Sequence, residues 1–250
     1  MTKRMQWTLA LFFVALIIWL GWRAYQHRQA QSGLAEIKQR GALRVGLDAS
    51  FPPFESLDEN GQVVGLDADL ARAIADDLGV ELEFVNIGFD GLYDALLIKR
   101  VDMLLSGLPV DPYRSRDVAY STNYFNAGQV LVTRRDDIQL VDDLMGQTVA
   151  VEWGSLADME ARRLQKTIPN LQINPQPDAQ SALQFDIAIV DGVTALGNQQ
   201  MRIVKYLSDE WYAAAVSVEN SALLAEINKT LARMQESGEM ERLQEKRIGE

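Results

Sequence analysis

The chain has 250 residues, of which 48% are hydrophobic and 24% are charged, a composition typical of one large globular domain or of two smaller lobes. The formal net charge is −11. All four basic residues of the first 32 positions precede the segment expected to fold, so that segment contains 20 basic and 35 acidic residues. This acidic balance disfavours nucleic-acid binding. Cysteine is absent and the only histidine is His27, so disulfides, thiolate chemistry, histidine triads and histidine metal sites are excluded from the folded part.

The N-terminal segment 7–22 contains 16 residues without a charge and follows two basic residues. It is longer than a typical signal-peptide core and slightly short for a full membrane span. Tryptophans near both of its ends suit the two membrane interfaces, and the nearest small-x-small site, at 30–32, lies too far away to favour cleavage. We predict an uncleaved signal anchor within 1–40, ending in a polar helix or spacer over 23–40, with a cleaved export signal as the alternative. Either form places the rest of the chain on the periplasmic or extracytoplasmic side.

Strands and helices are predicted to alternate from residue 43 onward. Strands are expected at 43–47, 82–87 and 101–107, where β-branched and other apolar residues recur. The segment 65–79 has the period of an amphipathic helix, with Asp67 as a candidate N-cap and Gly79 as its stop, and 90–100 is a second helix. The residues between the first strand and the first helix are expected to form a loop and a turn. This alternation predicts a mostly parallel sheet.

A second α/β set follows. Its strands are predicted at 129–133, 147–151 and 185–190, and its helical stretches near 138–145, 155–166 and 178–184. Two apolar segments and a long helical tail over 222–247 complete the chain. Two sets of this size predict two α/β lobes with a cleft between them, where ligands would collect at the carboxyl ends of strands. Four polar residues fall at such ends: Asp48, Ser106, Glu152 and Asp191.

Arg114 follows a tight bend that contains Gly107, Pro109 and Pro112. It is either a solvated surface arginine or a planar fork that binds a carboxylate through two hydrogen bonds. Asp191 is either the N-cap of the next helix or a carboxylate that holds an ammonium group. The pattern alone favours a core position for Phe51 and Phe89, whereas Glu152 and Trp153 form either an exposed turn or a cleft wall. The sequence has no phosphate-binding or dinucleotide-binding glycine motif and no calcium-loop spacing.

Four stretches together resemble the extracytoplasmic solute-binding proteins of family 3, which serve ABC transporters for polar amino acids. They are "GALRVGLDASFPPFESLDENGQVVGLDADLARAIADDLG", "FDGLYDAL", "VDMLLSGLPVDPYRSRDVAYSTNYF" and "FDIAIVDG". The resemblance runs from about residue 41 to the C-terminus. It implies a two-lobed type II periplasmic-binding fold, a non-enzymatic monomer that binds an amino acid without cofactor or metal, and an ABC permease as partner.

The resemblance also implies domain bounds and site residues. The first lobe would comprise 41–127 and 211–250 and the second lobe 128–210, with crossings near 124–129 and 208–213. Arg114 matches the residue that clamps the α-carboxylate, and Asp191 matches the residue that holds the α-ammonium. The other matching positions are Asp48, Phe51, Phe89, Ser106 and Gly107 in the first lobe, and Glu152 and Ser155 in the second.

The sequence departs from the family at Pro109, where the usual residue is Ser or Thr, because proline offers neither a hydroxyl nor an N–H donor. Asp48 and Glu152 add two acids to the expected site, which suggests a cationic ligand side chain such as that of arginine or lysine. Two other functions remain open. One is a dehydratase on the same fold, using acidic residues as acid and base, and the other is a ligand-sensing input protein.

Overall fold

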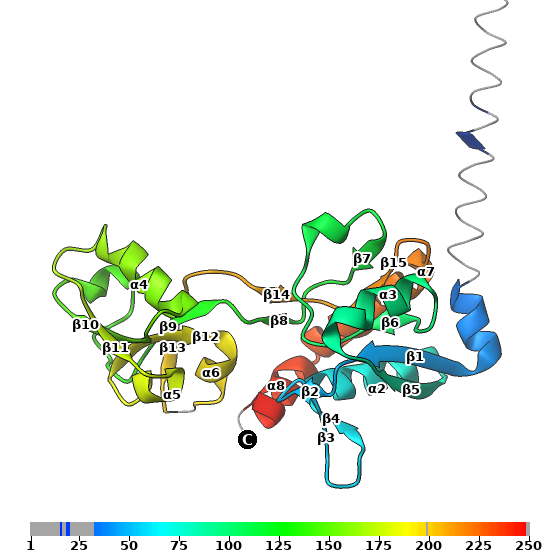
Figure 1. The fold of residues 1–250 in the computed structure, drawn as a ribbon, viewed down its shortest axis with the longest axis horizontal. Helices are drawn as coiled ribbons and strands as arrows, with labels where there is room; N and C mark the ends of the chain where they lie inside the picture. The colour runs from blue at the N-terminus through cyan, green and yellow to red at the C-terminus, as the bar shows by residue number, and fades with distance from the viewer. Residues whose placement is uncertain (1–15, 17–18, 21–32, 199, 249–250) are drawn as a thin grey trace, which may run out of the picture.

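The computed structural model describes residues 16, 19–20, 33–198 and 200–248, and it contains two α/β lobes that lie apart from each other (Figure 1). Each lobe is built on a five-stranded sheet, with the strand order β5-β1-β6-β15-β7 in the first and β11-β10-β12-β9-β13 in the second. The two-lobed α/β architecture is therefore confirmed. Each sheet is mixed, since two of its pairings are parallel and two are antiparallel.

The first lobe begins with a helix over 33–40 and ends with the two C-terminal helices. Its sheet strands are β1 (Ala42–Leu47), β5 (Glu81–Asn86), β6 (Met103–Leu104), β7 (Val118–Tyr120) and β15 (Ala215–Ser217). Its helices are α2 (Leu66–Leu78), α3 (Leu92–Leu97), α7 (Ser221–Glu236) and α8 (Glu239–Ile248), with the 3₁₀ turns η1 (Phe89–Gly91) and η2 (Pro112–Arg114). Buried residues of α2, α7 and α8 form one core with the sheet, and α3 forms a separate core on its other side.

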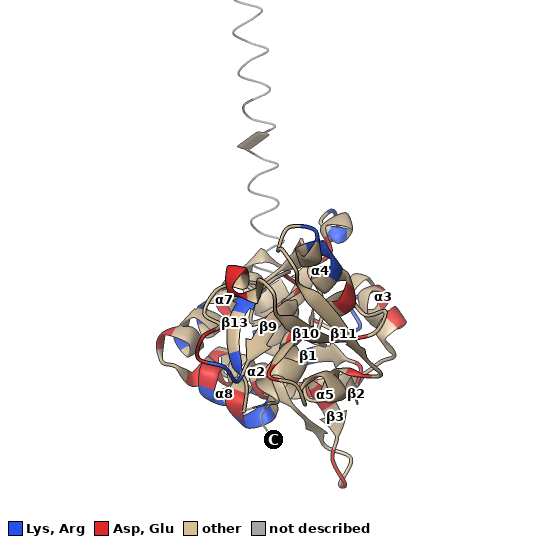
Figure 2. Cartoon of the chain, turned by 90° about the vertical axis from the view of Figure 1, so that its left-hand side faces the viewer, with Lys and Arg blue, Asp and Glu red and all other residues tan. Residues whose placement is uncertain are grey.

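The second lobe repeats this layered plan. Its strands are β9 (Gln129–Thr133), β10 (Thr148–Glu152), β11 (Gln172–Gln176), β12 (Ile187–Asp191) and β13 (Arg202–Tyr206). Its helices are α4 (Leu156–Gln165), α5 (Ala179–Ala182) and α6 (Gly192–Leu196), with the 3₁₀ turn η3 (Val141–Leu144). One core contains residues of α4, and the core on the other side contains residues of α5 and α6. Figure 2 views the molecule from the side of the second lobe. It shows acidic and basic positions interspersed along α8 of the first lobe.

Two short strands carry the chain between the lobes. β8 (Phe125–Asn126) leads into the second lobe, and β14 (Trp211–Tyr212) leads back and pairs with β8 in antiparallel fashion. Both lie within the segments 124–129 and 208–213, where the resemblance places the crossings. The Asn126 side chain strengthens the pair, because its Oδ1 accepts hydrogen bonds from the N–H groups of Gly128 (2.9 Å) and Glu210 (3.0 Å).

The signal anchor predicted over 7–22 lies outside the described residues, apart from 16, 19 and 20. None of the helices that the structure describes is both long and apolar enough to span a membrane. The end of the predicted spacer is part of the fold, because residues 33–40 are helical and Ile37 is buried in the core of the first lobe.

Several local predictions need correction. Asp67 is not the N-cap of the helix: Gly65 occupies that position, and Asp67 is buried in the first turn of α2. Most of the residues expected to form a loop and a turn belong to a small antiparallel sheet of β2 (Ser50–Phe51), β3 (Glu55–Leu57) and β4 (Val63–Val64). The helical tail is divided between α7 and α8, because Gly238 adopts a φ of +67°. The Gly79 stop is confirmed, with a left-handed C-cap at φ +70°.

Gly65 holds the entry to α2 in a backbone conformation that requires glycine. Its φ is +129°, and a Cβ at this position would lie 2.2 Å from the carbonyl oxygen of Phe54. We expect Gly65→Ala to lower the free energy of unfolding by more than about 2 kcal/mol, because the strained backbone and the clash both oppose it. Gly61→Ala is the matched control: Gly61 also has a positive φ, +75°, but nothing lies within 4 Å of its Cβ position. Urea denaturation compares the two variants. Equal decreases in the free energy of unfolding would contradict a clash between a Cβ at position 65 and the carbonyl oxygen of Phe54.

Candidate functional site

The carboxyl ends of β1 and β6 meet at one edge of the first sheet, because the two strands are parallel neighbours. Asp48 ties this edge together. Its Oδ2 accepts a hydrogen bond from the N–H of Phe89 (2.8 Å), its Oδ1 accepts one from the Ser50 hydroxyl (2.7 Å), and its own N–H donates to Ser106 Oγ (3.0 Å). Three segments far apart in the sequence are thereby fixed to one another.

Two aromatic rings lie at the same edge and remain accessible. Phe51 is 42% exposed and Phe89 46% exposed, so their interpretation as core residues is wrong. The ring of Phe51 stacks on the buried Phe54 with centroids 5.3 Å apart. It also passes so close to Gly107 that a Cβ there would lie 2.6 Å from the ring, and Gly107 has a φ of +49°. This glycine is therefore needed both for its backbone conformation and for the contact with the ring.

Arg114 is held by two contacts that leave the end of its guanidinium accessible. Its Nε lies 3.3 Å from Asp111 Oδ2, and its Cζ lies 3.8 Å above the centroid of the Tyr93 ring. The Tyr93 hydroxyl is fixed in turn by Tyr120, with 2.9 Å between their oxygens. No hydrogen bond within the described residues involves Nη1 or Nη2 of Arg114, whose side chain is 46% exposed. The arrangement presents a preorganised two-pronged donor at the surface of the first lobe.

In the second lobe, β10 ends at Glu152 and passes through a short turn into α4. Ser155 is the N-cap of α4: its Oγ accepts a hydrogen bond from the N–H of Asp158 (3.3 Å) and donates one to the carbonyl oxygen of Glu152 (2.7 Å). Glu152 is partly buried, whereas Trp153 is highly exposed. The strand end thus places an acid, a hydroxyl and an indole ring next to one another in sequence and in space.

Asp191 ends β12, which lies beside β10 and runs parallel to it. Its carboxylate caps α6, because Oδ1 accepts from the N–H of Thr194 (2.9 Å) and Oδ2 accepts from its hydroxyl (2.6 Å). The interpretation as an N-cap is confirmed, and it is compatible with a ligand contact because the residue remains partly exposed. The next residue, Gly192, approaches the crossing strand so closely that a Cβ would lie 2.4 Å from the carbonyl oxygen of Asn126.

The candidate residues fall into two groups, one on each lobe, which we call the two half-sites. Those of the first lobe are Asp48, Phe51, Phe89, Ser106, Gly107 and Arg114, and those of the second are Glu152, Ser155 and Asp191. Within the part of the chain that is described, no hydrogen bond or ion pair joins one half-site to the other, and the two lobes lie apart (Figure 1). The same part contains no group of three or more acidic, histidine or cysteine residues placed to hold a metal ion.

Pro109 lies where the first half-site meets the returning strand β14. It pairs with Tyr212, and the flanking bonds run from the N–H of Val110 to the carbonyl oxygen of Trp211 (2.9 Å) and from Ala213 N–H to Leu108 O (3.1 Å). In this type of pair the nitrogen of the central residue points away from the partner strand. The proline therefore removes no hydrogen bond from the pairing.

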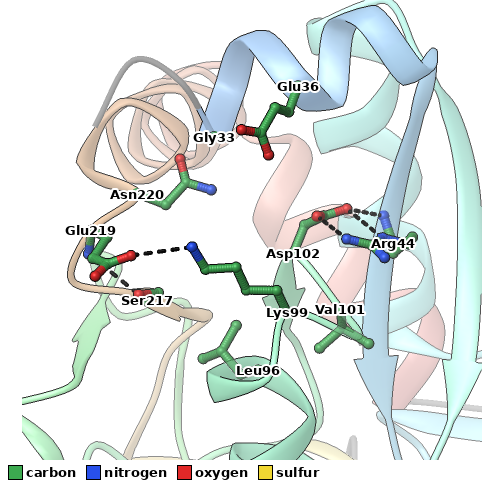
Figure 3. Close-up of a pocket in the computed structure, with 10 residues that line it drawn as sticks. All are labelled: Gly33, Glu36, Arg44, Leu96, Lys99, Val101, Asp102, Ser217, Glu219 and Asn220. Atoms are coloured by element: carbon green, nitrogen blue, oxygen red, sulfur yellow. Dashed lines mark hydrogen bonds and ion pairs between the residues drawn. The ribbon is translucent and has the colours of Figure 1, made fainter. Parts of the chain in front are cut away.

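A partly open hollow of about 110 Å³ lies away from both half-sites (Figure 3). It is bounded by the start of the N-terminal helix at Gly33, by Asn220 before α7 and by Lys99, whose ammonium group pairs with Glu219 at 3.3 Å. None of the candidate site residues lines it.

Two features near the site were missed in the sequence. Tyr93 lies beneath Arg114 although the two are 21 positions apart, and no periodicity of the sequence indicates that contact. Glu55 and Asp67 are fully buried behind the strand end that carries Ser106 and Gly107. Neither acid is distinguished in the sequence from the partly exposed acids near it, such as Asp58 and Asp69.

Comparison with known proteins gives consistent matches over most of the chain. The model of the bacterial extracellular solute-binding proteins, family 3, matches residues 43–250. The arginine-binding extracellular protein ArtP of Bacillus subtilis (strain 168) is 32% identical over 217 residues, which cover 82% of this chain and 85% of that protein.

Two solved structures extend the comparison. A mutant of ArgBP from T. maritima is 40% identical, with a TM-score of 0.56, and the match covers 87% of this chain and 100% of the other. The ancestral amino acid-binding protein AncCDT-1, described as a precursor of cyclohexadienyl dehydratase, is 32% identical, with a TM-score of 0.56 and coverage of 86% and 98%.

The two roles of Asp191, cap and charge, can be separated by substitution. We expect Asp191→Ala to lower the free energy of unfolding by about 1 kcal/mol, because α6 loses its cap, whereas Asp191→Asn should lose much less because asparagine caps equally well. Chemical denaturation measures both. Similar losses for alanine and asparagine would show that the negative charge, and not the cap, stabilises this end of β12.

Proposed function

The chain belongs to the bacterial extracellular solute-binding proteins of family 3, and we propose that its two half-sites close on a cationic amino acid whose α-carboxylate binds Arg114 and whose α-ammonium binds Asp191. Its function is the extracytoplasmic binding of an amino acid for an ABC transporter. The observation that carries the proposed binding mode is the accessible guanidinium of Arg114, which Tyr93 and Asp111 hold on the 3₁₀ turn η2 of the first lobe.

Arg114 is suited to a carboxylate because its contacts use one edge and one face of the guanidinium. Asp111 engages Nε, and Tyr93 covers a face. In any guanidinium, one N–H bond of each terminal nitrogen is parallel to one of the other, so the two can donate two hydrogen bonds to one carboxylate. Since the tyrosine ring and Asp111 restrict the side chain before the ligand arrives, less conformational entropy is lost on binding.

The matching charge comes from the opposite lobe. Asp191 ends β12 in the second lobe, so a zwitterion between the lobes would have both of its charges paired only after closure. An unpaired charge removed from water costs several kcal/mol. The ligand would therefore favour the closed state by its difference in affinity for the two states.

Two further acids support a cationic side chain on the ligand. Asp48 lies at the strand end of the first lobe and Glu152 at that of the second. The Asp48 carboxylate accepts bonds from Phe89 and Ser50, and each carboxylate oxygen can accept more than one bond. ArtP and ArgBP, both similar to this chain, are described as arginine-binding proteins.

Pro109 limits how the carboxylate is held. The nitrogen of this residue points away from β14, and in proline it carries no hydrogen. The carboxylate would therefore depend more on Arg114, on the N–H groups at the start of α4 and on Ser155 than in relatives with Ser or Thr at this position. This makes the contribution of Arg114 correspondingly large.

We propose that the protein acts without catalysis, as a monomer, that it delivers its ligand to a membrane permease, and that the N-terminal segment anchors it. The proposed lobes comprise 41–127 with 211–250, and 128–210. The similarity to AncCDT-1, described as a precursor of cyclohexadienyl dehydratase, supports a dehydratase as the alternative function. Turnover of prephenate or arogenate by the purified protein would replace the binding function with a dehydratase. Copurification with a signalling protein in place of a permease would favour a sensor.

The proposed role of Arg114 predicts a large loss of affinity on truncation. We expect Arg114→Ala to weaken amino-acid binding by at least about thirty-fold, or about 2 kcal/mol, because the ligand carboxylate would be desolvated without its partner. Titration calorimetry with the twenty amino acids, ornithine and citrulline measures this for each ligand that binds. Arg163→Ala is the matched control, because Arg163 also pairs with an acid three positions earlier, Glu160, at 2.7 Å. Equal affinities of the two variants would exclude Arg114 from the site.

The proposed ligand class predicts a charge-dependent effect at Glu152. We expect Glu152→Gln to weaken L-arginine binding about tenfold, since a hydrogen bond to a charged group contributes about 1.5 kcal/mol or more, and to change glutamine binding little. Glu160→Gln, an acidic residue of α4 that pairs with Arg163, is the control for net charge. Tighter binding of glutamate than of arginine by the unaltered protein would contradict a cationic ligand.

A further inference from the structure

Two acidic side chains are completely buried in the first lobe, behind the strand end of the amino-acid site. Glu55 belongs to β3 and Asp67 to the first turn of α2, and both have no exposed surface. Neither side chain can reach the ligand, because both lie in the interior. Carboxyl groups are almost never buried in this way unless they are paired.

Each acid holds one residue of the candidate site. Glu55 Oε1 accepts a hydrogen bond of 2.6 Å from the hydroxyl of Ser106, and that same hydroxyl oxygen accepts the N–H of Asp48. Asp67 Oδ2 accepts a hydrogen bond of 2.6 Å from the N–H of Gly107. It also accepts one of 2.9 Å from the hydroxyl of Tyr124, next to the crossing strand β8.

The second oxygen of each carboxyl group is in a different environment. Glu55 Oε2 and Asp67 Oδ1 are buried, and within the described residues neither accepts a hydrogen bond from any N–H or hydroxyl group. The two side chains bind adjacent residues, Ser106 and Gly107, so their carboxyl groups lie behind the same short stretch of backbone. Two ionised carboxylates in contact would repel, whereas one proton between them would satisfy both oxygens.

Among the described residues, the titratable groups found to act on the pair are Asp48, Tyr124 and Tyr212, and none of these is cationic. The arginines on or against α2 are engaged by other acids: Arg72 and Arg247 pair with Asp69, and Arg233 pairs with Asp77. A proton is therefore the simplest means of reducing the charge of the pair.

The environment also indicates which residue carries the proton. Burial raises the pKa of Glu55, and the negative charge of Asp67 raises it further. Burial raises the pKa of Asp67 as well, but the N–H of Gly107 and the hydroxyl of Tyr124 stabilise its ionised form. Glu55 is thus the acid and Asp67 the carboxylate.

We propose that Glu55 and Asp67 share one proton and act as a positioning pair that fixes Ser106 and Gly107 of the amino-acid site. The proton lies between Glu55 Oε2 and Asp67 Oδ1, which leaves Glu55 Oε1 to accept from Ser106 and Asp67 Oδ2 to accept from Gly107. The role in ligand binding rests on the proposed function, whereas the shared proton is a property of the unliganded protein.

A glutamine at position 55 would reproduce the protonated acid, because its carbonyl oxygen can accept from Ser106 while its NH₂ group donates to Asp67. The native state binds the Glu55 proton more tightly than the unfolded chain does, so the free energy of unfolding falls as pH rises from the unfolded pKa towards the native one. Glu55→Gln removes this contribution. We therefore expect the stability of Glu55→Gln, relative to the unaltered protein, to rise between pH 6 and pH 10.

The experiment measures urea denaturation of the full-length unliganded protein, Glu55→Gln and Asp67→Asn between pH 6 and pH 10, and calorimetric binding of L-arginine at pH 7. We expect Glu55→Gln to bind within threefold of the unaltered protein and Glu55→Leu to bind at least tenfold more weakly, because leucine leaves the Ser106 hydroxyl without its acceptor. The double variant Glu55→Gln/Asp67→Asn should be less stable than either single variant, because two NH₂ groups face each other as long as the two side-chain carbonyls accept from Ser106 and Gly107.

Parallel pH profiles of Glu55→Gln and the unaltered protein would overturn the shared proton, and so would a double variant no less stable than Asp67→Asn. Equal arginine affinities of the glutamine and leucine variants would overturn the positioning role. If the unaltered protein does not bind L-arginine, the proposed ligand class fails, while the pH profiles of the unliganded protein still test the pair.

Discussion

The two lobes are joined by only two crossings of the chain, and the antiparallel pair of β8 and β14 holds those crossings together. The candidate site is attached to this pair from both sides. Pro109, two residues after Gly107 of the first half-site, pairs with Tyr212, and Gly192, next to Asp191, packs against the backbone of Asn126. Any rotation of one lobe against the other must therefore occur within a few residues of the candidate site. The hinge and the site form one mechanical unit.

In the proposed binding mode, the distribution of charge couples closure of the lobes to the ligand. In the open arrangement Arg114 and the acid at the end of β12 lie on separate, accessible surfaces, so each is hydrated. Closure without a ligand would bring the acids of both lobes together and remove water from them, which is unfavourable. Closure around a zwitterion supplies a partner for each charge. The same residues that would bind the ligand therefore oppose closure in its absence.

The sequence predicted the parts of the fold that local pattern determines. Continuous apolar runs identified β9, β10 and β12, and Gly79 marked the end of α2. Asp67 was misassigned because a buried acid and a helix cap look alike in sequence, and only Tyr124 and Gly107, distant in the chain, distinguish them. The strands of the crossing and of the small sheet have only two or three residues, too few to show an alternation of apolar and polar side chains. The half-site residues followed from the family resemblance, whereas the stacking of Arg114 on Tyr93 required the structure.

The buried acids explain why this part of the core is polar. An apolar pair of similar volume often replaces buried charges without loss of stability. Here, however, such a pair would leave the hydroxyl of Ser106 and the N–H of Gly107 without acceptors, each at a cost of about 1–3 kcal/mol. Both residues lie at the site edge, so groups released from the core would be free to turn towards the ligand or away from it. Because Glu55 and Asp67 accept these hydrogen bonds, the backbone of Ser106 and Gly107 is held in place at the candidate site. One proton shared by the two acids reduces the negative charge buried there.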